Sequence, residues 1–279
     1  MRSVGDEPLG DDTVLLTGAA GLIGTWLRRT APPGIEICSV VHRRELPRTR
    51  SYRCDLRDAS AVVRMVEEVA PTVVLHAAYA MDEGSIVDCT RNVVEAAART
   101  GSCVVHTSTD VVFSGDGSRR DEASPPDPIA DYGRWKAEAE RIVQRAPVSG
   151  AVVRLPLVVS VDPPDQGLQR MRTGAATGEP STWFTDEVRQ PALASDLAAA
   201  LWRIIALGPA ERSGVWQLPG PESLTRHQLA QRTATALGID AGAIRAATTP
   251  EGMVRPRHID LGADRAIREI GWAPDRVMP

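Results

Sequence analysis

Short apolar runs alternate with segments of helical periodicity from residue 13 onward. The first apolar run, at 14–16, is followed by the pattern of a helix at 22–29. Strand-like and helix-like patterns then alternate at 35–41, 61–69, 72–79, 90–99, 104–113 and 131–145. Chains that alternate strands and helices through short connections form parallel sheets with helices on both faces. The pattern therefore predicts an α/β protein with a doubly wound parallel sheet of the Rossmann type over residues 13–155.

Composition excludes several classes of function. The 279 residues carry a formal net charge of −4, with arginines scattered among acids and only 4% aromatic residues, which does not favour nucleic-acid binding. No apolar run reaches membrane-spanning length and the N-terminus lacks a signal-peptide pattern, so we expect a cytoplasmic protein without a membrane partner. The four cysteines have no metal-ligand spacing, which predicts buried thiols and no metal site.

Three glycines open the first helical pattern, in the order Thr-Gly-x-x-Gly-x-x-Gly. Gly18 permits a tight turn, Gly21 lets the backbone approach a phosphate, and Gly24 lets the helix lie close to its strand. The free N–H groups of the first helical turn favour an anion. The spacing predicts that a dinucleotide pyrophosphate binds at Gly18, Gly21, Leu22, Ile23 and Gly24.

The end of the second strand indicates which dinucleotide binds. A carboxylate there binds the ribose hydroxyls of NAD(H), whereas arginines pair with the 2′-phosphate of NADP(H). This chain has His42, Arg43 and Arg44 at that position. We therefore expect NADP(H) to be favoured over NAD(H); the alternative is that both arginines are ordinary surface residues.

Tyr132 and Lys136 are four residues apart, which places them on one face of a helix. Lys136 is the single lysine among 32 basic residues. An adjacent ammonium is expected to lower the pKa of the phenol, so that it exchanges a proton with a substrate oxygen. Ser108 or Thr109, at the end of the preceding strand, is expected to hydrogen-bond the same oxygen.

These motifs resemble those of the extended short-chain dehydrogenases/reductases. Within that superfamily the segment 108–115, Ser-Thr-Asp-Val-Val-Phe-Ser-Gly, is most similar to the dTDP-4-dehydrorhamnose reductase group. The resemblance covers nearly the whole chain and implies a catalytic triad of Thr109, Tyr132 and Lys136, with Asp110 beside it. It also implies that the cofactor is contacted by Asp55, Leu56, Ala77, Ala78, Tyr79, Tyr132 and Lys136. Ile86 stands where related enzymes have an asparagine that supports the catalytic site.

Composition, together with the resemblance, indicates how the rest of the chain is organised. Residues 1–12 are expected to be a flexible tail, and 156–279 mainly a small substrate-binding lobe, with about 186–206 returning to the Rossmann core. The polar segment 114–130 is expected to be a loop that closes over substrate. In relatives, helices equivalent to 91–100 and 132–145 pair, which predicts a possible homodimer. The expected substrate-site residues are Ser108, Asp110, Arg189 and Arg255, the two arginines at a diphosphate.

The resemblance predicts an NADPH-dependent reductase of a keto group on a nucleotide-activated deoxysugar, of the dTDP-4-keto-6-deoxyhexose type. Alternatives are a nucleotide-sugar epimerase or dehydratase, or a ketoreductase of another metabolite. A regulatory subunit that binds the cofactor without catalysis is a further alternative from a different class.

Overall fold

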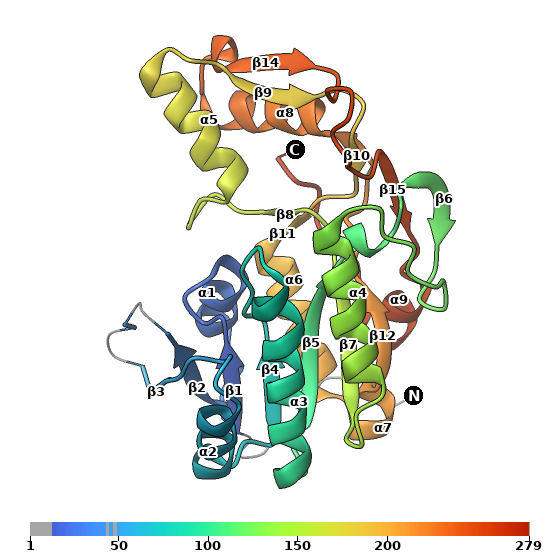
Figure 1. Cartoon of the computed structure of the whole chain (residues 1–279). Helices are drawn as coiled ribbons and strands as arrows, with labels where there is room; N and C mark the ends of the chain where they lie inside the picture. Colours follow the sequence, from blue (N-terminus) through green and yellow to red (C-terminus); the bar gives the residue numbers. More distant parts are fainter. Residues whose placement is uncertain (1–12, 43–44, 47–48, 279) are drawn as a thin grey trace.

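A seven-stranded parallel sheet forms the centre of the protein (Figure 1). The computed structural model describes residues 13–42, 45–46 and 49–278. The strand order is β12-β7-β5-β4-β1-β2-β3, and every pairing in this sheet is parallel. The strands are β1 (Thr13–Thr17), β2 (Glu36–Val41), β3 (Ser51–Arg53), β4 (Val73–His76), β5 (Cys103–Thr109), β7 (Gly150–Leu155) and β12 (Gly214–Gln217). The predicted doubly wound fold is confirmed.

Helices cover both faces of this sheet and explain why its strands are apolar without alternation. Leu15 points to one face and Leu16 to the other, and both are fully buried. One hydrophobic cluster contains residues of α1 (Leu22–Arg29), α6 (Ala194–Ala206) and α9 (Asp264–Ile270). The cluster on the opposite face contains residues of α2 (Ala59–Val69), α3 (Cys89–Thr100) and α4 (Asp131–Gln144). The helices therefore enclose one hydrophobic cluster on each face of the sheet.

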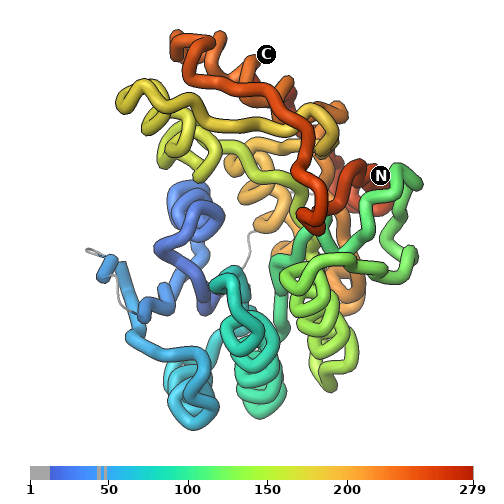
Figure 2. Tube along the Cα trace, turned by 45° about the horizontal axis from the view of Figure 1, so that its top comes forward, coloured from blue at the N-terminus to red at the C-terminus, as the bar shows by residue number. Residues whose placement is uncertain are grey.

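A smaller lobe lies beyond the carboxyl ends of the sheet, at the top of Figure 1 and tilted forward in Figure 2. Its own hydrophobic cluster includes Met171, Trp183 and Ala230. Its helices are α5 (Gln166–Thr177) and α8 (Arg226–Leu237), and the latter begins with a capping box between Thr225 and Gln228. A parallel pair, β9 (Ser181–Phe184) and β14 (Ile244–Ala247), packs beside them.

Two further small sheets join this lobe to the main sheet. One is the parallel pair β8 (Val158–Val159) and β11 (Ala192–Leu193). The other has the order β13-β10-β15-β6. Its strands are β6 (Asp116–Arg120), β10 (Val188–Arg189), β13 (Leu224–Thr225) and β15 (His258–Leu261). The short helix α7 (Pro209–Arg212) precedes β12.

The structure corrects the prediction of an irregular loop at 114–130. Residues 116–120 form β6, which pairs in parallel with β15 from near the C-terminus. The polar composition hid this strand because an edge strand exposes much of its surface to water. Residues 214–217 also lie in the main sheet, where β12 pairs with β7. The predicted tail at 1–12 lies outside the described residues.

No helix in the described part of the chain is long and apolar enough to cross a bilayer.

Candidate functional site

The glycine turn lies where β1 and β4 run side by side, although the chain leaves them in opposite directions across the sheet. Open α/β sheets bind ligands at such a switch point, outside the carboxyl ends of the strands. Gly18 has φ of +69°, and a Cβ on it would lie 2.6 Å from the carbonyl carbon of Ala77. A Cβ on Gly24 would lie 2.2 Å from the Gly18 carbonyl oxygen. Contacts within the protein therefore require glycine at both positions.

Gly21 differs, because the protein leaves space beside it. A Cβ at Gly21 would approach one described atom within 4 Å, the Gly18 carbonyl oxygen at 3.1 Å. Among the described residues, none caps α1 with its side chain, and the first turn, which begins with Leu22 and Ile23, holds no acid. The exposed N–H groups and the space beside Gly21 fit a pyrophosphate. Ala77 and Ala78, which follow β4, border the same turn.

The region expected to hold the adenosine is only partly described. Arg43 and Arg44 lie outside the described residues, whereas His42 Nε2 lies 3.8 Å from Asp55 Oδ2. The Asp55 carboxylate accepts hydrogen bonds from the side chain and the backbone N–H of Arg57, which lower its pKa to about 2. Leu56 is buried, and its carbonyl accepts a hydrogen bond from Asn92 Nδ2 at 2.9 Å. Asp55 and His42 thus meet at the ends of neighbouring strands.

The predicted catalytic pair lies on α4, at the carboxyl ends of β4 and β5. Lys136 is 3% exposed, and its Nζ donates a hydrogen bond to the Thr107 carbonyl at 2.9 Å. The same Nζ lies 5.3 Å from the ring centroid of Tyr79. The rings of Tyr79 and Tyr132 have centroids 6.0 Å apart. Tyr79, which is 54% exposed, therefore sits at the entrance to the Tyr132 and Lys136 pair.

Burial dominates the electrostatics of this pair. It lowers the pKa of Lys136 to about 8, against the opposing effect of Glu140. It also raises the pKa of Tyr132, with smaller contributions from Tyr79 and Asp110 in the same direction, while a hydrogen bond with Thr109 lowers it. The net shift of the Tyr132 pKa in the protein alone is therefore upward, whereas the sequence predicted a lowered value. The reason is that loss of hydration penalises the phenolate more than its neighbours stabilise it.

The structure separates the two predicted hydroxyls. Thr109 stays beside the tyrosine, with its Oγ1 3.3 Å from Asp110 Oδ1. Ser108 is buried, and its hydroxyl donates a 2.5 Å hydrogen bond to Glu140, which forms a buried ion pair with Arg154. Successive residues of a strand point to opposite faces, so only one of the two hydroxyls reaches the tyrosine. We therefore correct the placement of Ser108 in the substrate site, because it stabilises a buried ion pair.

Asp110 and Arg189, both expected at the substrate, are paired with each other. Arg189 Nε lies 3.6 Å from Asp110 Oδ2, and Arg189 Nη2 lies 3.2 Å from Glu187 Oε1. All three side chains are buried. Arg255 is partly exposed and binds the other side of Glu187, with Nε 2.8 Å from Oε2. Burial raises the pKa of Asp110, while Arg189 acts in the opposite direction.

Two arginines that the sequence did not single out lie close to the ring of Trp183. The Cζ of Arg170 on α5 lies 4.2 Å from the indole centroid, and that of Arg226 on α8 lies 5.8 Å from it. Burial lowers the pKa of Arg226 to about 10; Glu187 opposes this effect, and Arg189, Arg170 and Arg255 add to it. The lobe thus gathers four guanidinium groups around one carboxylate. No sequence signal distinguishes these arginines from the many others.

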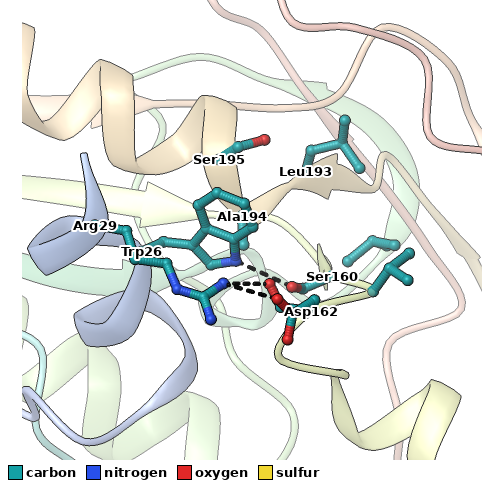
Figure 3. A pocket seen from close by; sticks show the side chains of 9 residues that line it. Trp26, Arg29, Ser160, Asp162, Leu193, Ala194 and Ser195 are labelled. Atoms are coloured by element: carbon teal, nitrogen blue, oxygen red, sulfur yellow. Dashed lines mark hydrogen bonds and ion pairs between the residues drawn. The ribbon is translucent and has the colours of Figure 1, made fainter.

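A separate cavity of about 310 Å³ lies beside α1 and the start of α6 (Figure 3). Trp26 Nε1 donates a hydrogen bond to Ser160 Oγ at 3.0 Å. Arg29 Nη1 donates one to the Asp162 carbonyl at 2.7 Å. None of the predicted site residues lines this cavity, so it is distinct from the site described above.

Comparisons with known proteins agree with this geometry. The curated dTDP-4-dehydrorhamnose reductase of Streptomyces griseus is 28% identical over 275 residues, which cover 90% of this chain and 86% of the reductase. Methionine adenosyltransferase 2 subunit beta of Bos taurus is 24% identical over 278 residues, covering 90% of this chain and 80% of that protein. The structure of dTDP-4-dehydrorhamnose reductase from Bacillus anthracis str. Ames in complex with NADP has a TM-score of 0.80 at 21% identity, covering 94% of each chain.

The family model described as the RmlD substrate binding domain matches residues 12–275. This match spans both the parallel sheet and the C-terminal lobe. The chain therefore belongs to the RmlD substrate binding domain family, whose members include nucleotide-sugar reductases.

Proposed function

We propose that this protein uses NADPH to reduce a keto group on a nucleotide-activated deoxysugar. The observation that carries the proposal is the convergence of Thr109, Tyr132 and Lys136 beside the glycine turn at the switch point of the sheet. Tyr132 donates the proton to the substrate oxygen, and Thr109 hydrogen-bonds that oxygen. Lys136 holds the nicotinamide ribose. When bound, the dinucleotide supplies the hydride.

The described acids near the end of β2 support NADPH over NADH. Asp55 is held by Arg57, and Glu45 is paired with Arg53 at 2.8 Å. An acid that is already paired with arginine repels a 2′-phosphate less than a free one. The related reductase from Bacillus anthracis binds NADP, which supports the same choice. Arg43 and Arg44 are the proposed partners of the 2′-phosphate.

The arginines around Trp183 support an anionic substrate. Arg170 and Arg226 have no carboxylate within 4 Å among the described residues, and the side chain of Arg255 is 43% exposed. Guanidinium groups pair with diphosphates through charge-assisted hydrogen bonds. We assign Arg170, Arg226 and Arg255 to the nucleoside diphosphate, while Trp183, which is buried in the hydrophobic cluster of the lobe, supports Arg170 and Arg226. The relative from Streptomyces griseus, a dTDP-4-dehydrorhamnose reductase, supports a dTDP-linked sugar.

The state of Asp110 favours a reductase over a dehydratase or an epimerase. Dehydratases and epimerases need an additional acid or base near the segment of Thr109, and Asp110 is the candidate for that role. Its carboxylate is buried and paired with Arg189. A paired, buried carboxylate is poorly placed to exchange protons with a sugar.

The test is consumption of NADPH in the presence of dTDP-4-keto-6-deoxyglucose, with NADH and a non-sugar ketone as comparisons. We expect turnover with NADPH and the sugar nucleotide. Tyr132→Phe keeps the ring and removes the proton donor, so it should reduce kcat by about a hundredfold or more. Turnover that is unchanged in Tyr132→Phe contradicts the proposed mechanism.

A subunit of another enzyme is the second candidate, because methionine adenosyltransferase 2 subunit beta of Bos taurus matches 90% of this chain. Tight NADPH binding without turnover on any keto sugar favours that candidate. The homodimer through α3 and α4 remains a prediction, which light scattering of the purified protein tests.

A further inference from the structure

A chain of buried hydrogen bonds lies directly beneath the glycine turn. At its centre is His76, the last residue of β4, which is 1% exposed. Its Nδ1 lies 2.8 Å from Thr17 Oγ1, and its Nε2 lies 3.2 Å from Thr90 Oγ1. Thr90 Oγ1 in turn donates to the Ile86 carbonyl at 2.6 Å. Thr17 and Thr90 are fully buried, so water does not replace any of these bonds.

The direction of each bond in this chain follows from Thr17. Its Oγ1 accepts hydrogen bonds from the backbone N–H groups of Ala77 and Ala78, each at 3.1 Å. With both lone pairs used, the hydroxyl donates its single proton to His76 Nδ1. His76 Nδ1 is therefore bare, Nε2 carries the proton, and that proton goes to Thr90. Every donor and acceptor in the chain is then satisfied by a single tautomer.

This chain of hydrogen bonds joins three segments that border the proposed cofactor site. Thr17 directly precedes Gly18, whose backbone packs against the peptide that joins Ala77 and Ala78. Ile86 lies in η1 (Gly84–Asp88), a π-helical turn that leads into α3. Turns of this kind inside helices are frequent at functional sites. Moving His76 would therefore shift the glycine turn relative to the alanines that follow β4.

We propose that His76 is a positioning residue that, through Thr17 and Thr90, holds the glycine turn against Ala77 and Ala78 and thereby sets the affinity for the dinucleotide. This inference rests on the proposed function in one respect, the binding of NAD(P)H. It does not make His76 an acid or a base in the reaction, because its ring is buried behind the residues that face the site.

The chain of hydrogen bonds requires His76 to be neutral, because Thr17 has no lone pair left to accept a second ring proton. The groups that face the ring favour this state. Lys136 lies on α4, and His106 on β5 has its ring centroid 5.3 Å away. Burial, and then Lys136, lower the pKa of His76 to about 3, and burial lowers that of His106 well below its ordinary value. Titration of His76 should therefore contribute nothing to the pH dependence of dinucleotide affinity between pH 5 and 8.

The experiment compares valine and serine substitutions in the two threonines. Thr17→Val and Thr90→Val keep the shape and remove the hydroxyl, whereas Thr17→Ser and Thr90→Ser keep the hydroxyl. His76→Leu removes the centre of the chain. NADPH and NADH affinities are measured by calorimetric titration at a temperature well below the melting point of every variant, so that turnover is not required.

We expect Thr17→Val and His76→Leu to weaken NADPH binding by about tenfold or more, and Thr90→Val by less, because each leaves a buried polar group unpaired. Both serine variants should bind like the wild type. The double variant Thr17→Val/His76→Leu should bind only slightly more weakly than either single variant, because both changes break the same chain.

A purely structural role predicts a different result, in which melting temperatures fall and affinities do not change. Folded valine variants with wild-type affinity overturn the proposal and leave the proposed function intact. If His76→Leu does not fold, Thr17→Val and Thr90→Val with their serine partners decide the question. Wild-type protein that binds neither NADPH nor NADH overturns both the proposed function and this inference.

Discussion

Replacing Arg189 by methionine distinguishes between two roles for this residue. The sequence suggested that Arg189 binds the substrate diphosphate, whereas the structure buries it between Asp110 and Glu187. Its Nη1 and Nη2 also donate hydrogen bonds to the carbonyls of Val188 and Pro256, at 2.7 and 2.8 Å. A side chain with these partners and 4% exposure holds two segments of the lobe next to Thr109.

The expected loss in the free energy of unfolding follows from the buried charge that Arg189→Met leaves without a partner. Removing one partner of a buried ion pair typically lowers the free energy of unfolding by about 3–5 kcal/mol, because the other charge stays buried. Glu187 keeps Arg255, but Asp110 loses its ion-pair partner. We therefore expect a loss of about 3 kcal/mol at neutral pH, near the lower end of that range.

The pH dependence of this loss has a defined sign. Burial already raises the pKa of Asp110, and removing Arg189 raises it further. A carboxyl group whose pKa is raised on folding adds to the free energy of unfolding at low pH. This contribution is lost as the pH rises through the pKa that the group has in the folded protein. The deficit of Arg189→Met should therefore shrink in mildly acidic buffer. Asp110→Asn in the same protein should restore part of the stability, because it removes the unpaired charge.

The assays are urea unfolding followed by tryptophan fluorescence, and steady-state kinetics with the sugar nucleotide. A positioning role predicts a lower kcat with a KM changed by less than about threefold. The reasoning is refuted if Arg189→Met loses less than about 1 kcal/mol of stability while KM rises tenfold at constant kcat. That outcome restores Arg189 as a direct ligand of the diphosphate.

Two further predictions follow from the glycine turn and the buried lysine. Gly21→Ala should keep the melting temperature within a few degrees but weaken NADPH binding at least about tenfold. Gly18→Ala should lower both the melting temperature and the NADPH affinity, because its Cβ meets the Ala77 backbone. Equal effects of the two variants in melting and titration experiments contradict this prediction. Lys136→Met should abolish turnover yet stabilise the fold at pH 7 by up to about 3 kcal/mol. Burial lowers the pKa of Lys136 from 10.5 to about 8 on folding. The folded protein is therefore penalised for holding the charged lysine at pH 7, and this penalty disappears as the pH rises from about 8 toward 10.5. Urea unfolding should show the advantage of Lys136→Met shrinking from pH 7 to pH 10, and a constant difference contradicts the assignment.

Local sequence patterns were sufficient to predict the parallel sheet and its helices. The turn at Gly18, Gly21 and Gly24 and the pair Tyr132 and Lys136 have fixed short spacings, so each motif describes one local structure. The helix at 22–29 was predicted with its observed bounds. The polar strand β6 was missed because its partner β15 lies more than a hundred residues away in the sequence.

The same limit applies to the arginines. Nothing local distinguishes Arg189, which pairs with Asp110, from Arg226, which among the described residues has no carboxylate within 4 Å. Both expectations for the hydroxyls were plausible from sequence, since Ser108 and Thr109 are adjacent. The pleat of β5 and the position of Glu140 on α4 decided that Ser108 stabilises a buried ion pair.

The sequence alone singled out the residues to which the proposed function assigns the chemistry: the glycine turn, Thr109, Tyr132 and the single lysine. It did so because these residues act through short-range geometry, a turn or one helical face. Only the tertiary structure decided which charges are free, which hydroxyl faces Tyr132, and how Thr17, His76 and Thr90 join into one chain. Those properties depend on burial and on partners far apart in the sequence, and a pattern of neighbouring residues does not contain them.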